Sequence, residues 1–214
     1  MAGTITDLEP QKRARDRVNV YLDGEFAFGL ADFVAVELKT GMYLSDEAIA
    51  KLKAADGLER AHNRALDYLS YRPRSERELR DYLFDKGYAE GIVEAVIDRL
   101  QRVDLIDDVA FARYWCENRA RFRPRGKRML RYELSQKGVP SAAIEEALED
   151  YDEVAAVQNV AEGQARRLKH LPPDQFQRRL FERLARRGFS YDLIQETLAT
   201  QDFPQLHGEQ SEED

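Results

Sequence analysis

Apolar and polar residues alternate in the first part of the chain, as they do in half-buried β-strands. Residues 18–30 alternate on both sides of Asp23-Gly24. Because this dipeptide tolerates positive φ at both central positions of a tight turn, the segment predicts a β-hairpin. Residues 4–8 predict a third strand that ends at Pro10, since a two-stranded ribbon alone is only marginally stable in water.

A helix is expected to follow the strands. Ser45 is a typical N-cap residue, and Asp46 and Glu47 place acids in the first turn, where they favour the positive end of the helix dipole. The helix would run through Ile49 and Leu52. Two interpretations of this region stay open: a small β cap that closes one end of a helical array, or a strand edge that binds a partner.

From about residue 61 the apolar spacing becomes helical and the chain repeats itself three times. Each repeat contains a basic residue followed by glycine, at Gly87, Gly138 and Gly188, which are 51 and 50 residues apart. Apolar residues recur at fixed distances before and after each glycine. They are Leu79, Leu83, Tyr88, Val93 and Ile97; Leu130, Leu134, Val139, Ile144 and Leu148; and Leu180, Leu184, Phe189, Ile194 and Leu198. A period of this length indicates an array of supersecondary units.

Each repeat predicts three helices. Apolar spacing places one set of residues of the middle repeat on a single face of helix one: Phe111, Trp115, Asn118 and Phe122. Helix two is expected to open with capping-box spacing in two repeats, at Ser75–Glu78 and Asp174–Gln177. The glycine of each repeat has the position at which a left-handed residue ends helix two.

The expected fold is therefore mainly α: three tandem three-helix repeats in an elongated array, preceded by a small β-hairpin or three-stranded extension. The predicted boundaries are residues 1–58 for the extension with a linking helix, 59–106, 107–153 and 154–203 for the three repeats, and 204–214 for an acidic tail.

Composition narrows the class of protein. The 214 residues include 33 Lys and Arg against 40 Asp and Glu, a net charge of −7, which argues against a generally basic nucleic-acid binder. No apolar run reaches the roughly 20 residues of a membrane-spanning helix, and no secretory signal is recognised. Cys116 is the single cysteine, and the three histidines lie far apart, so no metal site is expected. These features predict a cytoplasmic protein.

Positive charge is nevertheless concentrated in two segments. Residues 109–131 and 164–187 each contain eight Arg or Lys, whereas residues 138–163 contain seven acids and no base. Exposed like charges repel one another unless a counter-charge is supplied, by phosphate or by an acidic protein surface. The candidate partner-binding residues are Arg119, Arg121, Arg123, Arg125, Lys127, Arg128 and Arg131. The alternative for any one of them is a solvated side chain in an internal ion pair.

Other candidate chemistry is weaker. Tyr114 and Trp115 could stack on nucleic-acid bases, although aromatic residues at helical spacing are more often core residues. Cys116 has no neighbouring histidine or aspartate that would activate it. Gly126-Lys127 lacks the remaining residues of a phosphate-binding loop. We therefore expect no enzyme, no catalytic residue, no metal and no cofactor.

Several segments resemble the RecX family of recombinase regulators. They are Leu105–Tyr114, Arg125-Gly126, Glu133–Val139 and Ile144–Leu148 in the middle repeat, Leu66–Leu69 and Arg74–Leu79 in the first repeat, and Asp23–Phe28 in the hairpin. The third repeat departs most, since it lacks the Arg-Pro-Arg linker of the other two.

The resemblance implies tandem three-helix repeats that bind the RecA filament on single-stranded DNA and inhibit its strand exchange and ATP hydrolysis. It also implies a monomer acting in DNA repair, recombination and the SOS response, with at most weak direct contact to DNA. Two other functions stay open from the residues themselves. A helix-turn-helix module would bind DNA without the recombinase, and a scaffold would bridge proteins with no dependence on DNA.

Overall fold

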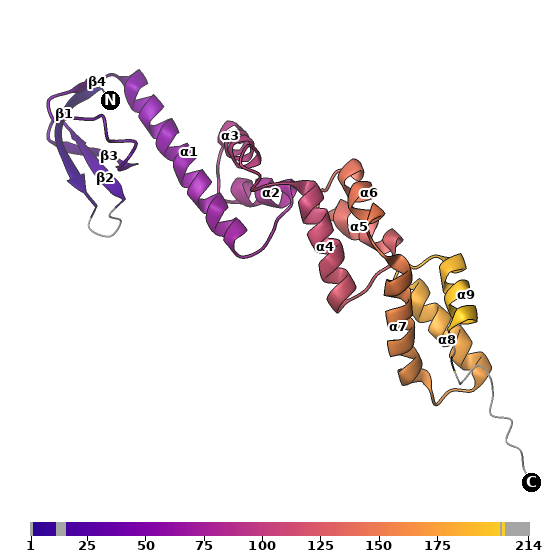
Figure 1. Cartoon of the computed structure of the whole chain (residues 1–214). Helices are drawn as coiled ribbons and strands as arrows, with labels where there is room; N and C mark the ends of the chain where they lie inside the picture. The colour runs from indigo at the N-terminus through magenta and orange to yellow at the C-terminus, as the bar shows by residue number, and fades with distance from the viewer. Residues whose placement is uncertain (1, 12–15, 202, 204–214) are drawn as a thin grey trace, which may run out of the picture. The chain divides into compact units, whose positions relative to one another are not determined.

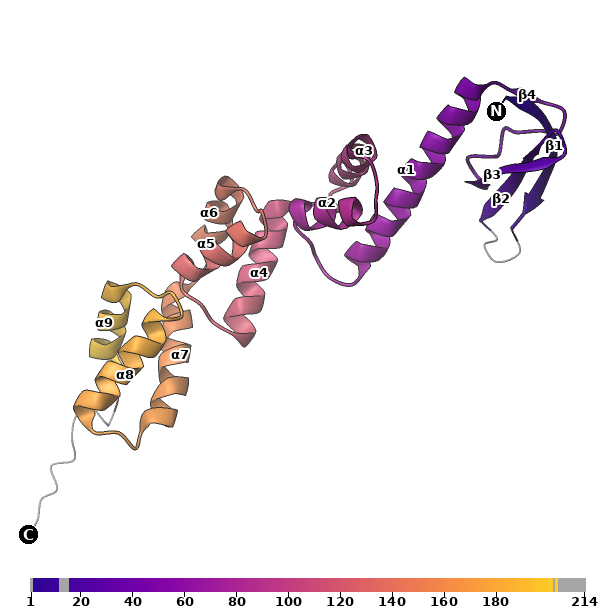
Figure 2. The ribbon, with the colours of Figure 1, turned by 180° about the vertical axis from the view of Figure 1, so that it is seen from behind.

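The computed structural model describes residues 2–11, 16–201 and 203, so the proposed acidic tail, 204–214, lies outside the described residues. This described part of the chain contains one four-stranded sheet followed by nine helices (Figures 1 and 2). The chain divides into two compact units. The first contains Met1–Arg72 and Leu79–Leu105, and the second contains Pro73–Glu78 and Ile106–Asp214.

The sheet of the first unit is antiparallel, with strand order β3-β2-β1-β4. Its strands are β1 (Gly3–Pro10), β2 (Arg17–Leu22), β3 (Glu25–Ala31) and β4 (Tyr43–Leu44). The predicted hairpin is confirmed: Asp23 and Gly24 have φ of 51° and 90° between β2 and β3. The prediction of three strands was incomplete, because β4 has only two residues and is too short to show an alternating pattern.

Helix α1 (Asp46–Ser70) follows β4 directly. The predicted N-cap is confirmed, since the Ser45 hydroxyl accepts a hydrogen bond from the Ala48 backbone N–H at 3.2 Å. Ile49 on this helix joins Val20 and Leu30 in the buried core beneath the sheet. The helix continues without a break to Ser70, so the boundary predicted at residues 58 and 59 falls within one element.

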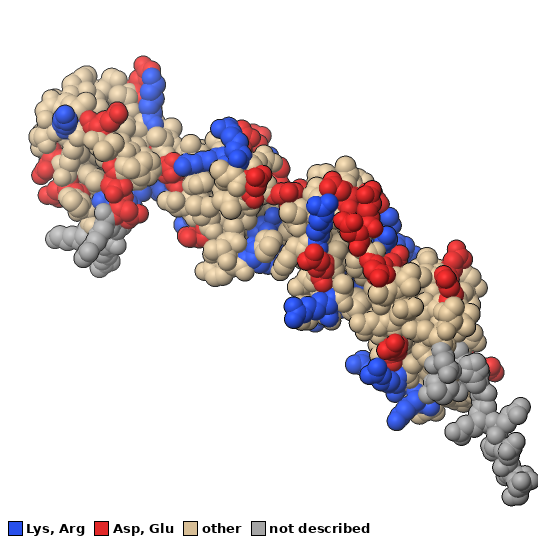
Figure 3. Space-filling view, viewed as in Figure 1, with Lys and Arg blue, Asp and Glu red and all other residues tan. Residues whose placement is uncertain are grey.

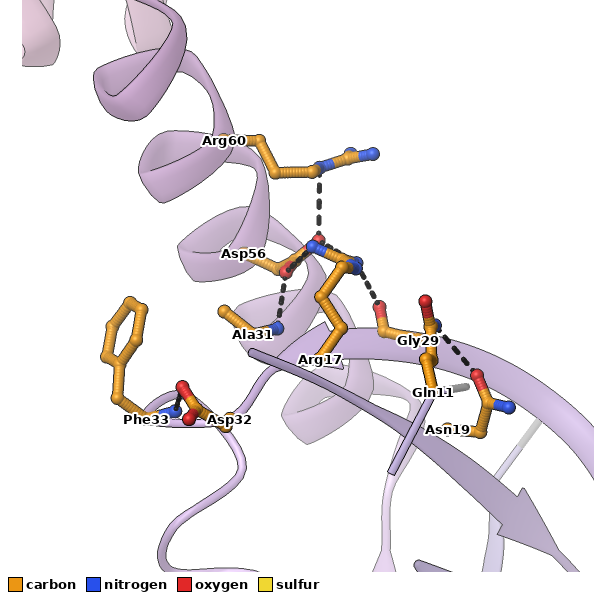
Figure 4. A network of polar contacts seen from close by, with 9 residues as sticks. All are labelled: Gln11, Arg17, Asn19, Gly29, Ala31, Asp32, Phe33, Asp56 and Arg60. Atoms are coloured by element: carbon orange, nitrogen blue, oxygen red, sulfur yellow. Dashed lines mark hydrogen bonds and ion pairs between the residues drawn. The ribbon is translucent and has the colours of Figure 1, made fainter. Parts of the chain in front are cut away.

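A buried carboxylate ties the sheet to α1 (Figure 4). Asp56 is 4% exposed and accepts hydrogen bonds from Arg17 Nη1 and Nη2 of β2, at 3.1 and 3.2 Å. The Ala31 backbone N–H, at the end of β3, donates to the same carboxylate at 2.8 Å, and Arg60 Nε lies 3.1 Å from it. Because a buried charge is costly unless it is paired and hydrogen-bonded, these contacts fix where the sheet meets the helix.

Two further helices complete the first repeat, α2 (Glu76–Asp85) and α3 (Glu90–Gln101). The apolar positions predicted from the repeat are buried here, except that Tyr88 is half-buried. Arg99 Nη1 of α3 donates to Glu59 Oε1 of α1 at 2.6 Å, and Arg80 of α2 pairs with Glu94 of α3. These two arginine–glutamate pairs connect α3 to α1 and to α2, in addition to the apolar contacts.

The second unit contains the other two repeats. Its helices are α4 (Asp108–Phe122), α5 (Lys127–Gln136), α6 (Ser141–Glu149), α7 (Glu153–Leu168), α8 (Pro173–Ala185) and α9 (Tyr191–Thr200). The predicted leucines of helix two in both repeats, Leu130, Leu134, Leu180 and Leu184, are fully buried. The glycines that end helix two, Gly138 and Gly188, have positive φ of 76° and 92°. Gly87 of the first unit likewise has a positive φ, of 82°. The repeat and the left-handed helix ends are therefore confirmed.

Two local predictions were wrong. Phe122, which was expected on the buried face of α4, is 65% exposed. The buried residues of this helix are Phe111, Ala112 and Cys116, and the helix packs against α6. Asp174 is not an N-cap, because α8 already starts at Pro173. Proline suits the first helical position, where its missing N–H would have no helical partner.

Candidate partner-binding surface

The predicted basic residues lie on consecutive parts of one repeat. They occupy the C-terminal half of α4, the loop at 123–126 and the first turns of α5. Arg123, which precedes a proline, ends α4, and Gly126 takes the N-cap position of α5. The seven residues have different surroundings, because carboxylates pair with the side chains of Arg119, Arg125 and Arg131.

The first group is Arg119 and Arg125, which both lie against Glu133 of α5. Glu133 accepts hydrogen bonds from Arg119 Nε at 2.7 Å and from Trp115 Nε1 at 2.9 Å, and Arg125 Nε lies 3.8 Å away. The Arg119 guanidinium also lies 4.5 Å from the centroid of the Trp115 ring. Arg119 therefore packs within the repeat. The Trp115 ring contacts a second cation as well, since Lys137 Nζ lies 4.9 Å from the ring centroid.

Arg131 and Lys127 of α5 form the second group. Arg131 Nε and Nη2 donate to the two carboxylate oxygens of Glu145 at 2.7 and 2.8 Å. These hydrogen bonds raise the pKa of Arg131 and lower the pKa of Glu145. The backbone N–H of Lys127 donates to Glu153 Oε1 at 2.8 Å, which places an acid at the N-terminus of α5.

The third group is exposed. Arg121 lies with its guanidinium 5.2 Å from the Phe122 ring centroid, and Arg128 Nη2 is 3.4 Å from the Ala185 carbonyl oxygen. Arg121, Arg123 and Arg128 form no ion pair with any carboxylate that the structure describes. These three side chains are the ones best placed to meet an external anion.

The structure brings two of the predicted residues together with arginines of the third repeat. A hollow of about 560 Å³ in the second unit is lined only by basic and amide side chains: Arg123, Arg125, Gln164, Arg167, Arg183, Arg186 and Arg187. We call this the arginine hollow. The sequence prediction missed its third-repeat half, although the second basic segment, 164–187, was the available signal.

Several arginines of the hollow are held in place by their neighbours. Arg183 Nη1 donates to Gln164 Oε1 at 2.7 Å, and Arg187 Nη1 donates to the Pro124 carbonyl oxygen at 3.4 Å. Burial lowers the pKa of Arg187, and the positive charges of Arg125 and Arg167 lower it further. Positive charge is thus crowded inside the hollow.

Charge is also separated on the visible surface of the second unit (Figure 3). Acidic side chains gather over α6, whereas basic side chains gather at the C-terminal ends of α4 and α7. Both basic ends lead to elements that contribute arginines to the hollow. The net negative charge of the chain therefore conceals a local positive field.

Other candidate chemistry has no support among the described residues. Cys116 is 3% exposed, and burial raises the pKa of its thiol to about 11, which keeps it protonated at neutral pH. Residues 2–11, 16–201 and 203 contain no group of three or more His, Cys, Asp or Glu that could hold a metal ion. Within the same described ranges, no helix is long and apolar enough to cross a membrane.

Family models match nearly the whole described chain. The RecX N-terminal domain matches residues 3–45, and the first, second and third RecX three-helix domains match 61–100, 107–148 and 150–198. A regulatory protein RecX from Levilactobacillus brevis is 36% identical over 97% of this chain and 80% of its own length. The one from Prosthecochloris aestuarii is 41% identical over 65% of this chain and 91% of its own length.

Solved structures agree with these matches. A crystal structure of regulatory protein RecX aligns with a TM-score of 0.75 at 30% identity, covering 93% of this chain and all of that one. The crystal structure of RecX from Lactobacillus salivarius aligns with a TM-score of 0.63 at 30% identity, covering 68% of this chain and 96% of that one. The chain therefore belongs to the RecX family of regulatory proteins.

Proposed function

We propose that this protein is a non-enzymatic regulator that binds the RecA filament on single-stranded DNA and inhibits its ATPase and strand-exchange activities. Family membership supports the proposal most directly, because the N-terminal RecX domain and all three RecX three-helix domains occur here in order. Acting on that filament implies a cytoplasmic location and a role in DNA repair and recombination.

The charge pattern of the second unit also supports a regulator that acts by binding. A filament of protein and DNA offers both carboxylates and phosphates, and arginine pairs with either through two parallel hydrogen bonds. The exposed side chains Arg121, Arg123 and Arg128 have no described ion-pair partner and are the first candidates for this contact. Arg119, Arg125 and Arg131 contribute through their position and field, since each already pairs with a carboxylate within the fold. The contact of Lys127 with Glu153 is made by its backbone N–H, so its half-buried side chain is a further candidate for the contact with the filament.

The test is RecA ATPase activity on single-stranded DNA, measured with increasing amounts of this protein. We expect inhibition by the unchanged chain, and at least ten-fold weaker inhibition by the variant R121E/R123E/R128E. The matched control is R166E/R178E/R179E, which makes the same change in charge within the same unit and should inhibit nearly as well as the unchanged chain. Circular dichroism of both variants verifies that they are folded.

Three results would contradict the proposal in different ways. No effect of the unchanged chain on the ATPase would exclude regulation of the filament. Undiminished inhibition by folded R121E/R123E/R128E would exclude these three arginines from the contact. Binding to naked DNA without any effect on RecA would favour a DNA-binding module of helix-turn-helix type.

A further inference from the structure

We propose that the arginine hollow of the second unit binds the backbone phosphates of a single DNA strand. This inference rests on the proposed function, because the single strand inside the filament is the DNA that such a regulator meets. It deepens that function by assigning one site and one ligand chemistry, where arginine charge alone would fit acidic protein side chains equally well.

The hollow holds far more positive than negative charge. Six guanidinium groups line it, and among the described residues Glu133 is the carboxylate that pairs with any of them, 3.8 Å from Arg125 Nε. Glu133 is already bonded by Arg119 Nε and Trp115 Nε1, so its charge is shared. Crowded like charges with low-dielectric walls concentrate anions in the space between them.

The arginines are also partly fixed before any ligand arrives. Gln164 holds Arg183, and the Pro124 carbonyl holds Arg187. The Arg125 backbone carbonyl accepts a hydrogen bond from Tyr151 Oη at 2.7 Å, and Arg125 Nε is buried without a hydrogen-bond partner. That nitrogen lies 3.8 Å from Glu133 Oε1, so the Arg125 side chain is oriented by a carboxylate inside the fold. Guanidinium groups held in this way lose less entropy when they bind an anion.

The lining favours phosphate over an acidic protein segment. Only arginine and glutamine side chains line the hollow. The buried core of a protein–protein interface is usually apolar or aromatic and depleted in charge, so this hollow offers little to a polypeptide. Contacts to a nucleic-acid backbone, in contrast, are made largely by arginine and lysine and need no apolar surface.

The experiment measures binding of the full chain to a fluorescent oligo(dT) by anisotropy between 50 and 200 mM salt. The variant R167Q/R186Q removes two hollow charges, one on α7 and one at the end of α8. The control R166Q/R179Q removes one charge from each of the same helices outside the hollow. We expect at least ten-fold weaker binding for R167Q/R186Q and less than three-fold for the control. The log–log salt slope should fall by about 1.4 in the first variant, at about 0.7 per phosphate contact on single strands.

Two further probes identify the ligand chemistry. An abasic oligomer of the same length keeps the phosphates without the bases and should bind nearly as well as oligo(dT). A poly-glutamate peptide of equal charge should bind at least ten-fold more weakly. Equal weakening by the two double variants, no weakening by R167Q/R186Q, or poly-glutamate binding as tight as oligo(dT) would each overturn the inference.

The two proposals fail separately. Inhibition of RecA with no dependence of oligo(dT) binding on R167Q/R186Q would retain the regulator and remove the phosphate site. Oligo(dT) binding that depends on the hollow, with no effect on RecA, would retain the phosphate site and remove the regulator.

Discussion

The backbone N–H of Gly126 donates a hydrogen bond to the backbone carbonyl of Arg187 at 3.0 Å. Gly126 precedes α5, and Arg187 precedes the glycine that follows α8. We call this contact between two repeats a joint. An equivalent joint occurs in the second unit, where the hydroxyl of Ser75 donates to the carbonyl of Lys137 at 2.6 Å. The start of one helix two therefore contacts the end of the next helix two, once through a side chain and once through backbone alone.

Gly126→Ala is expected to destabilise the second unit. A Cβ at Gly126 would overlap the Gly188 carbonyl and the Phe189 nitrogen, which are backbone atoms that cannot rotate away. Overpacking of this kind costs about 1–3 kcal/mol of the free energy of unfolding. Urea unfolding followed by tryptophan fluorescence measures the stability of the second unit, because Trp115 is the single tryptophan and lies in this unit.

The control for this substitution is Gly163→Ala in α7, where a Cβ meets no atom within 4 Å. It should stabilise the unit by roughly 0.5–1 kcal/mol, since alanine is the better helix former. Equal urea midpoints for the Gly126 variant and the unchanged chain would show that the joint adapts to a larger residue.

Arg119→Gln and Arg123→Gln are expected to differ in stability. Arg119 loses a hydrogen bond to Glu133 and its contact with the Trp115 ring, which should lower the free energy of unfolding by about 1.5–3 kcal/mol. Arg123 is exposed and has no described ion pair, so its replacement should change stability by less than about 0.5 kcal/mol. Urea midpoints of the two variants decide this, and equal midpoints would contradict the structural role of Arg119.

Asp56→Asn is expected to loosen the N-terminal sheet from α1. The variant leaves the Arg17 guanidinium without its counter-charge, and breaking a buried ion pair costs about 3–5 kcal/mol. Hydrogen exchange of the amides in β1, β2 and β3 should become faster, as measured by mass spectrometry. The control is Arg60→Gln, because Arg60 is 58% exposed and its loss should leave exchange nearly unchanged. Unaltered exchange in Asp56→Asn would exclude the carboxylate as the main tie.

Asp108→Asn is expected to stabilise the second unit at pH 7. Burial raises the pKa of Asp108, only partly offset by the hydrogen bond at 3.0 Å from the Glu76 backbone N–H. Because the folded pKa lies above the unfolded one, the unchanged chain gains stability relative to the variant as the pH falls. The advantage of Asn should therefore shrink between pH 7 and about pH 4, near the usual pKa of aspartate.

Urea midpoints at several pH values test this dependence. Asp107→Asn is the control, since Asn caps a helix about as well as Asp, and its effect should vary little with pH. A variant Asp108→Asn that is less stable than the unchanged chain at pH 7 would show that the hydrogen bond from Glu76 outweighs the cost of burying the carboxylate.

Local patterns were enough to predict most elements of this fold. The period of the buried leucines, the left-handed glycines, the Asp23-Gly24 turn and the Ser45 cap each depend on residues close together in the sequence. The short strand β4 and the exposure of Phe122 could not be predicted in this way. Both depend on which segments pack together, and neither leaves a periodic signal over its few residues.

The candidate site, too, could be predicted only in part from the sequence. The sequence alone determined that positive charge is concentrated in residues 109–131 and 164–187 of a three-repeat chain. Only the tertiary structure decided which of these charges are neutralised and which are not. Glu133 and Glu145 hold Arg119 and Arg131, whereas Arg123 and Arg167, 44 residues apart, line one hollow. The physical reason is that the field at a site depends on distances through space and on burial, and helix packing alone sets both.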